Sequence, residues 1–294
     1  MESPELLKEA RFYATLPDGM VQCNLCPHHC RIKDGSRGIC RSRECRGGKL
    51  YALSYGRACS LAVDPVEKKP LNDFLPGTWC LSLSCTGCNL RCRWCQNSSI
   101  SQVATEDVDS EILTPSQIVA IALRRHYPSI AFTYTEPFTW WEYMYEIAVL
   151  SRRVGLRNIL VSAGYVEKEP LQEILPYIDA ANIDIKAMDD SIYREYCGGT
   201  LSPVLENILL MKEAGVHVEI TNLLVTDLTD SGQQVEGLCK WMAGHGLQDV
   251  PLHFSRFFPR YKYEDAPATP KATLIRAKQI ALASGIKTVY LGNI

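Results

Sequence analysis

Three cysteines lie within eight residues of this sequence in a spacing that suits a reactive metal cluster. They are Cys88, Cys92 and Cys95, arranged as C-x3-C-x2-C. Iron–sulfur cubanes are bound by cysteine thiolates, one to each iron, so three thiolates leave one iron open. An open coordination position distinguishes a reactive metal site from a structural one. The run therefore predicts a [4Fe–4S] cluster whose fourth iron binds a group that is not protein.

Cys85 offers an alternative, because it lies three residues before Cys88 and could supply a fourth thiolate. Four thiolates would make a closed electron-transfer cluster or a structural zinc site. Structural zinc sites usually pair two C-x2-C units across a longer arm, which this compact run lacks. We therefore favour the open cluster.

A second group of cysteines lies nearer the N-terminus. Cys23, Cys26 and Cys30 are followed by Cys40 after nine residues. Four thiolates that begin with C-x2-C suit a closed tetrahedral site, and the intervening histidines are then expected only to flank it. We favour zinc, because C-x2-C is a common zinc half-site and a closed site needs no redox role. A second iron–sulfur cluster is the alternative, because the cysteine spacing alone does not distinguish it from zinc. The segment is poor in aliphatic side chains, so it needs a metal for order.

Composition excludes several classes of protein. The chain has 294 residues, 46% apolar and 22% charged, which is ordinary for a globular protein. A net charge of −2 gives no basic surface for nucleic acid. No apolar run is long enough to cross a membrane, and residues 1–9 are charged and lack a signal-peptide core. We expect a cytoplasmic protein, in which clustered cysteines bind metal rather than form disulfides. The remaining cysteines are expected to be small buried side chains: Cys45, Cys59, Cys80, Cys197 and Cys239.

The elements that must position these residues differ between the two parts of the chain. Residues 1–75 form a predicted Cys-rich metal-binding region with little helical periodicity. Residues 76–294 alternate strand and helix. Strands are predicted at 79–83, 129–134, 158–161, 181–184, 216–220, 251–254 and 287–291, and helices at 139–154 and from 114, 202, 230 and 269. This alternation, without a dinucleotide-binding glycine fingerprint, predicts an α/β fold with a partial (β/α)6-type barrel.

Polar residues follow the predicted strands, where a barrel carries its chemistry. Glu136 follows the second strand, Asp184 and Lys186 follow the fourth, and His253 lies in the sixth. Carboxylates suit ammonium and hydroxyl groups of a ligand, and cations suit its carboxylate. A carboxylate at a strand end can instead cap a helix, but Lys186 beside Asp184 favours a functional site. His253 could equally be a hydrogen-bonded core histidine.

The sequence resembles the AmmeMemoRadiSam-system radical S-adenosylmethionine (SAM) enzymes, relatives of the pyruvate formate-lyase activating enzymes. The resemblance spans nearly the whole chain. It rests on residues 22–28 (QCNLCPH), 64–71 (DPVEKKPL), 87–92 (GCNLRC) with 95–97 (CQN), 134–137 (YTEP) and 253–257 (HFSRF). The cysteine run is common to the superfamily, and the first two stretches narrow it to this family. Lys68 and Lys69 of the second stretch are expected in a solvated turn unless they face the mouth of the barrel.

The resemblance implies roles for particular residues. A [4Fe–4S] cluster would be held by Cys88, Cys92 and Cys95, and SAM would be bound by Trp94, Glu136, Asp184, Lys186 and His253. Trp94 would lie by the adenine, Glu136 would meet the methionyl ammonium, and Asp184 with Lys186 matches a D-x-K motif. Activating enzymes often carry Gly-Gly before the glutamate and an Arg on the fifth strand, where this chain has Tyr134-Thr135 and Thr221-Asn222. Longer members continue into a cysteine-containing tail, whereas this sequence ends at residue 294.

The resemblance also implies an activity. The reduced cluster would pass one electron to SAM, giving methionine and a 5′-deoxyadenosyl radical that takes hydrogen from an unidentified substrate. One alternative is an activase that acts on a glycine of a partner glycyl radical enzyme, and another is a non-catalytic iron–sulfur or zinc protein. Implied partners are an external one-electron donor and the companion proteins of the system. Neither nucleic acid nor a membrane is expected.

Overall fold

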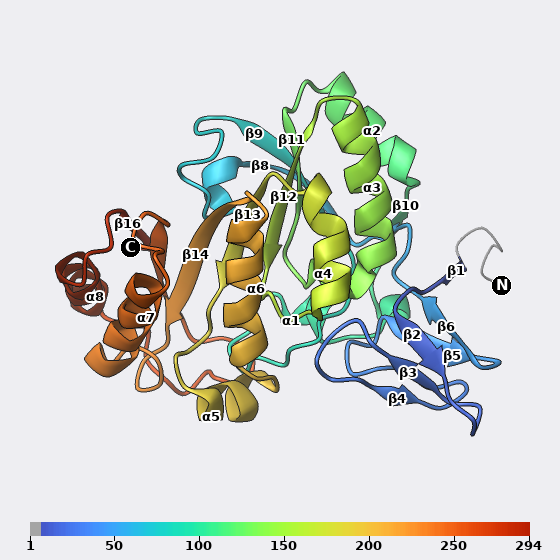
Figure 1. The fold of residues 1–294 in the computed structure, drawn as a ribbon, viewed down its shortest axis with the longest axis horizontal. Coiled ribbons are helices and arrows are strands. Elements are labelled where there is room, and N and C mark those ends of the chain that lie inside the picture. The colour runs from blue at the N-terminus through green and yellow to red at the C-terminus, as the bar shows by residue number, and fades with distance from the viewer. Residues whose placement is uncertain (1–6) are drawn as a thin grey trace.

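The computed structural model describes residues 7–294 as a curved sheet covered by helices, with a small antiparallel lobe beside it (Figure 1). We expect no signal peptide at residues 1–9, but most of this segment, residues 1–6, lies outside the described residues. Within residues 7–294, no helix combines the length and the apolar character that a membrane span requires.

The main sheet has eight strands, ordered β16-β15-β14-β13-β12-β11-β9-β8. Seven of them run parallel: β9 (Trp79–Ser84), β11 (Ser129–Phe132), β12 (Arg157–Ser162), β13 (Ala180–Asp184), β14 (His217–Leu224), β15 (Leu252–Arg256) and β16 (Val289–Gly292). The eighth, β8 (Ser60–Pro65), pairs antiparallel with β9 at the edge. The predicted α/β partial barrel is therefore confirmed.

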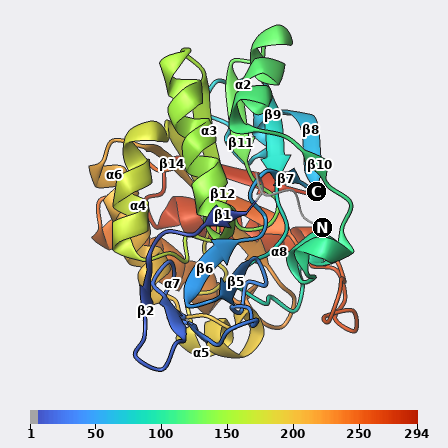
Figure 2. The ribbon, with the colours of Figure 1, turned by 90° about the vertical axis from the view of Figure 1, so that its right-hand side faces the viewer.

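Helices cover the outer face of this sheet (Figures 1 and 2). They are α2 (Pro115–Arg124), α3 (Trp141–Arg153), α4 (Lys168–Ile174), α6 (Ser202–Glu213), α7 (Gly232–Gly244) and α8 (Lys271–Ala283). Two short helices, α1 (Ser98–Ser101) and α5 (Asp190–Ile192), lie instead in the segments that follow β9 and β13. Shorter turns are η2 (Val66–Lys68), η3 (Thr105–Asp107), η4 (Pro137–Trp140), η5 (Leu175–Tyr177) and the π-helix η6 (Tyr193–Cys197). The predicted capping box forms, with Gln117 N donating to Thr114 Oγ1 at 3.3 Å and Thr114 N to Gln117 Oε1 at 2.8 Å.

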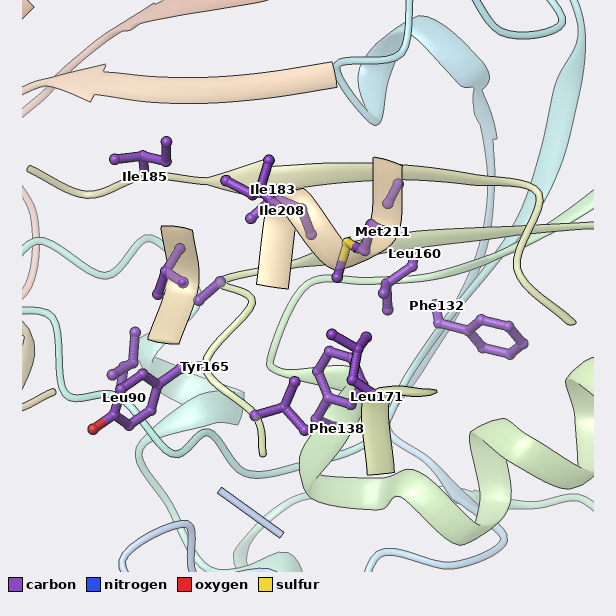
Figure 3. Packing of buried hydrophobic residues seen from close by; sticks show 14 of the residues in the cluster. Leu90, Phe132, Phe138, Leu160, Tyr165, Leu171, Ile183, Ile185, Ile208 and Met211 are labelled. Carbon is purple, nitrogen blue, oxygen red and sulfur yellow. The ribbon is translucent and has the colours of Figure 1, made fainter. Parts of the chain in front are cut away.

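Alternate residues of the strands face the helices and the inside of the barrel. Phe132, Leu160 and Ile183 pack outward in one continuous core with side chains of α4 and α6 (Figure 3). Burying each such side chain stabilises the fold by about 1.5–3 kcal/mol. The inward face is more polar, with residues such as Asn182 and Glu219 in register on neighbouring strands. The helices thus fix the outer face, and the inward face is left for chemistry.

Residues 69–73 close the inside of the barrel toward the strands' amino ends. Lys69 is only 2% exposed, and its Nζ lies 2.6 Å from Asp64 Oδ2. Asn182 Nδ2 donates to Pro70 O at 2.7 Å, and Glu219 accepts from Asn72 N at 3.1 Å. The expectation of a solvated turn is therefore wrong for Lys69, because an inward-facing carboxylate compensates its burial.

One other expectation differs from the structure. Strand β14 continues to Leu224, beyond the predicted end, because residues 220–224 pair with 252–256 of β15. The region before residue 60, for which no strands were predicted, forms short antiparallel strands: β1 (Lys8–Glu9), β2 (Tyr13–Thr15), β3 (Val21–Cys23), β4 (Arg31–Ile32), β5 (Arg43–Arg46), β6 (Lys49–Ala52) and β7 (Arg57–Ala58), the last paired with β10 (Glu111–Ile112). Such two- to four-residue strands are too short to show a sequence period.

Candidate active site

The three cysteines of the central run lie together in the loop that leaves β9. Burial raises the pKa of Cys88 well above its ordinary value, and the neighbouring charges of Glu136, Cys92 and Cys95 raise it further. Burial also raises the pKa of Cys85, but the neighbouring thiol that acts on Cys85 is Cys59 and not one of the three. An open cluster held by Cys88, Cys92 and Cys95 without Cys85 stays a prediction.

The donor set of the triad fits a cluster better than a single ion. Among residues 7–294, no three Cys, His, Asp or Glu side chains are close enough together to hold one metal ion. In a cubane each thiolate binds a different iron, so its thiolates stand farther apart than those around a single ion. Cys88, Cys92 and Cys95 supply one thiolate for each of three irons, which is the donor set of a cluster with one open iron.

The cysteine loop is fixed on η6 by backbone hydrogen bonds. Arg91 N donates to Cys197 O at 2.7 Å, and Arg93 N donates to Tyr196 O at 3.0 Å. Gly199 permits the close approach, because a Cβ at this residue would lie 2.6 Å from Leu90 Cδ2. Leu90 and Tyr165 lie side by side beneath the loop (Figure 3). A π-helix at this contact fits the frequent occurrence of such turns at functional sites.

Cys197 is fully buried, as the sequence analysis expected, and it also lies against Cys92, which the sequence did not indicate. A hydrogen bond from Cys197 lowers the pKa of Cys92, although burial of Cys92 acts in the opposite sense. Hydrogen bonds to cluster sulfurs tune reduction potential. No spacing rule could connect Cys92 with a cysteine so far along the chain. The pair Gly198-Gly199 directly after Cys197 was the only local sign of a close approach.

Glu136 is fully buried at the end of β11, next to the cysteine triad. Its carboxylate accepts hydrogen bonds from Ser162 Oγ at 2.7 Å, Ala163 N at 2.9 Å and Phe138 N at 3.3 Å. Burial raises the pKa of Glu136, although these donors act to lower it. Ser162 and Ala163, which the sequence analysis did not single out, thus hold an acceptor ready for a cationic group.

Asp184 and Lys186 form an ion pair on the same side of the barrel. Lys186 Nζ lies 2.7 Å from Asp184 Oδ2, and the Lys186 backbone N donates to Tyr193 Oη at 2.9 Å. Burial disfavours the Lys186 ammonium, but Asp184 and Cys92 more than offset it, so its pKa is raised. The charge of Lys186 also acts on Glu136. The fold therefore brings the cysteine triad, Glu136, Asp184 and Lys186 together.

Trp94 and His253 lie in different surroundings. Trp94 is 4% exposed and packs against Tyr196, with 6.4 Å between ring centroids, and against Tyr263 at 6.1 Å. His253 Nε2 lies 2.6 Å from Glu219 Oε2, and its ring stacks on Tyr290. His253 pairs in register with Thr221, which pairs with Asp184, so it lies at the same level of the barrel as the ion pair. Its contact with SAM stays a prediction.

Tyr134 adopts a backbone conformation that glycine usually occupies. Its φ of 72° lies in the left-handed region, which costs a non-glycine residue about 1 kcal/mol or more. The Tyr134 hydroxyl donates to Asp64, and Lys69 Nζ lies 3.2 Å from the Tyr134 hydroxyl oxygen. Asn97 Nδ2 donates to Tyr134 O at 2.9 Å. Side-chain contacts therefore maintain here a backbone turn that glycine adopts without strain.

The four N-terminal cysteines line one cavity outside the triad. Cys23, Cys26, Cys30 and Cys40 surround about 350 Å³ of empty space, counted out to its opening. Arg43, His28 and Asn89 also line it. Burial raises the pKa of Cys23 to about 11. The fold thus brings these cysteines together, as the sequence analysis expected; whether they bind metal stays a prediction.

Comparison with known proteins agrees with this geometry. The sequence model of the radical SAM superfamily matches residues 83–242. An uncharacterised protein of Methanocaldococcus jannaschii is 46% identical over 98% of this chain and 86% of its own length. The pyruvate formate-lyase-activating enzyme of Clostridium pasteurianum is 27% identical, over 52% of this chain and 64% of that enzyme.

A solved structure agrees in fold. A radical SAM methyltransferase from Sphaerobacter thermophilus aligns over 98% of this chain and 78% of its own, with a TM-score of 0.56 at 14% identity. The superfamily match covers more than half of the chain, and it includes the cysteine triad and the strands that carry Glu136 and Asp184. The chain therefore belongs to the radical SAM superfamily, is related to the pyruvate formate-lyase activating enzymes, and is an enzyme that cleaves SAM.

Proposed function

We propose that Cys88, Cys92 and Cys95 hold the [4Fe–4S] cluster and that Glu136, Asp184, Lys186, Trp94 and His253 form the SAM site. The observation that carries this proposal is that Glu136 lies between the cysteine triad and Lys186: its charge acts on Cys88, and the charge of Lys186 acts on Glu136. When bound, the cluster supplies the electron that breaks the sulfonium C–S bond of SAM.

The chain's own residues orient SAM in this proposal. The Glu136 carboxylate, already held by three donors, accepts from the methionyl ammonium. Asp184 accepts from hydroxyl groups, and Lys186 offers a cation for the SAM carboxylate. Trp94, in its aromatic cluster with Tyr196, limits water near the adenine. His253, fixed by Glu219, lies at the same level of the barrel as this ion pair and completes the site.

We further propose membership in the AmmeMemoRadiSam system, with its companion proteins as partners and an external one-electron donor. Residues 22–28 and 64–71 support it, because both contact functional parts: Cys26 lines the N-terminal cavity, and Lys69 and Asp64 hold Tyr134. The division into a metal-binding region at 1–75 and a barrel at 76–294 is part of the proposal, although β8 also pairs with β9. All thirteen cysteines are unpaired, which supports a reducing, cytoplasmic compartment.

The second candidate function is activation of a glycyl radical enzyme. The relative from Clostridium pasteurianum favours it, because its name is pyruvate formate-lyase-activating enzyme. Tyr134-Thr135 in place of Gly-Gly and Thr221-Asn222 in place of an Arg argue for a different substrate. Membership in an enzyme superfamily leaves no support for the non-catalytic alternative.

One experiment tests the SAM site. Anaerobically reconstituted Glu136→Ala and Asp184→Ala variants should keep wild-type iron content but bind SAM more weakly and make less 5′-deoxyadenosine. Wild-type SAM affinity in both variants would show that these carboxylates are only structural. To identify the hydrogen donor, the proposed companion proteins and a glycyl radical enzyme are then added to the reaction in separate experiments. Deuterium transfer into 5′-deoxyadenosine from a labelled protein glycine would favour the activase.

A further inference from the structure

The cavity lined by Cys23, Cys26, Cys30 and Cys40 gathers four thiols around one space. A [4Fe–4S] cluster needs one thiolate for each of its four irons, so these four cysteines could supply a complete ligand set. The four thiols also resemble the Cys88 triad, because neither group converges on a single-ion site within residues 7–294.

The polar groups around this cavity suit an anionic cluster. Arg43 is 1% exposed, and its Nη2 binds both oxygens of Glu142 at 2.8 Å. Its buried Nε has no hydrogen-bond partner, and Arg43 lines the cavity. A cluster ligated by four thiolates carries net negative charge, so a sulfur there would give this N–H an acceptor. A buried donor with no partner costs about 1–3 kcal/mol.

The same cavity abuts the loop that carries the triad. Asn89, the residue after Cys88, lines it, and the Asn89 side chain hydrogen-bonds to Cys26. His28 Nε2 lies 2.7 Å from Asn89 O. A Cβ at Gly87, whose φ is 101°, would lie 2.8 Å from Cys40 O. The residues on both sides of Cys88 thus touch the walls of the N-terminal cavity.

From this geometry we propose that Cys23, Cys26, Cys30 and Cys40 hold a second [4Fe–4S] cluster, which relays electrons to the SAM-cleaving cluster through the contact at Gly87 and Asn89. Cys30 and Cys40 are partly exposed, so an external donor can approach the second cluster from outside. The zinc expectation of the sequence analysis gives way to this proposal. The relay role rests on the proposed function, because it requires the Cys88 cluster to be the acceptor.

The electrons balance in this scheme. A low-potential one-electron donor, dithionite in the test below, reduces the second cluster by one electron. That cluster is reoxidised as the Cys88 cluster is reduced. Each electron then cleaves one SAM into methionine and the 5′-deoxyadenosyl radical, which takes one hydrogen atom from its surroundings. A protein with both clusters reduced therefore stores electrons for about two cleavages, and a protein with one cluster stores enough for about one.

Metal analysis of anaerobically purified wild type tests the cluster, and it does not depend on any variant folding. We expect about eight irons, about eight sulfides and no zinc per chain, whereas the zinc alternative gives about four irons and one zinc. Cys26→Ser/Cys30→Ser should lose about four irons and keep the SAM-perturbed electron paramagnetic resonance (EPR) signal of the triad. Cys45→Ser is the control, because Cys45 is buried in the same lobe but does not line the cavity. Loss of zinc, or no change in either metal, overturns the proposal.

A single-turnover measurement tests the relay. Protein is fully reduced, dithionite is removed, and excess SAM is added. Wild type and Cys45→Ser should yield about two 5′-deoxyadenosine per chain while both reduced EPR signals decay, and the double variant about one. If the second cluster stays reduced and wild type yields only about one 5′-deoxyadenosine per chain, the relay is refuted. No 5′-deoxyadenosine from any protein would instead refute the proposed function, while the iron count would still decide the second cluster.

Discussion

Glu136→Gln is the substitution that probes the SAM site most sharply, because it removes charge and keeps shape. The native carboxylate is fully buried with three donors at 2.7, 2.9 and 3.3 Å. A hydrogen bond to a charged group is worth about 1.5–3 kcal/mol. Losing the ammonium–carboxylate contact should therefore weaken SAM binding by about 10- to 150-fold, at about 1.4 kcal/mol for each factor of ten.

The assay is anaerobic equilibrium binding of radiolabelled SAM to the reconstituted protein, with iron content measured on the same samples. Ser162→Ala is the companion variant, because Ser162 donates to Glu136 at 2.7 Å without carrying charge. Burial already raises the pKa of Glu136, and the Ser162 hydrogen bond opposes this. Removing Ser162 raises the pKa further, so SAM affinity should fall as pH drops, since only the carboxylate attracts an ammonium.

Two results would refute this reasoning. SAM affinity in Glu136→Gln within about twofold of wild type would mean that the ammonium binds elsewhere. A loss of iron equal to the loss of SAM binding would mean that Glu136 supports the cysteine loop instead. A pH dependence in Ser162→Ala opposite in sign to that expected would show that the carboxylate is not the group that titrates.

Three further predictions test the surroundings of the site. Tyr134→Phe loses the contact with Asp64 but keeps the strained φ of 72°, so it should lower both SAM affinity and melting temperature. Tyr134→Gly relieves the strain and should retain SAM affinity. The same SAM affinity and the same melting temperature in the two variants would contradict this prediction. Gly199→Ala should displace Leu90, 2.6 Å from the new Cβ, and reduce iron content after reconstitution, an effect that an unchanged iron content would exclude. Burial would raise the pKa of Glu219, but its hydrogen bonds lower that pKa to about 2. Glu219 therefore contributes folding stability above pH 4.5, and this contribution is lost as the pH falls toward about 2. Glu219→Gln should flatten the pH dependence of the melting temperature, and an unchanged pH profile would contradict this prediction.

Local patterns in the sequence were enough to predict the main elements. Each predicted strand of the barrel is present, because alternating apolar segments between helix caps are strong local signals, as at Thr114 and Gln117. The (β/α) alternation then required the strand ends to meet at one mouth. That rule predicts the approach of Glu136 to Cys88 and of Lys186 to Glu136.

Long-range contacts could not be predicted from the sequence. The hydrogen bond between Cys197 and Cys92, and the burial of Lys69 against Asp64, depend on packing between segments that share no period or motif. Spacing also could not choose the metal of the N-terminal cysteines, because C-x2-C fits both zinc and iron–sulfur ligation.

The central claim is that Cys88, Cys92 and Cys95 alone hold the cluster that cleaves SAM. The most direct measurement is the EPR spectrum of the dithionite-reduced protein with and without SAM, together with 5′-deoxyadenosine formed on the same samples. Wild type and Cys85→Ala should show a SAM-perturbed signal and product, and Cys92→Ala should show neither. Signal and product retained in Cys92→Ala, or lost only in Cys85→Ala, would contradict the account.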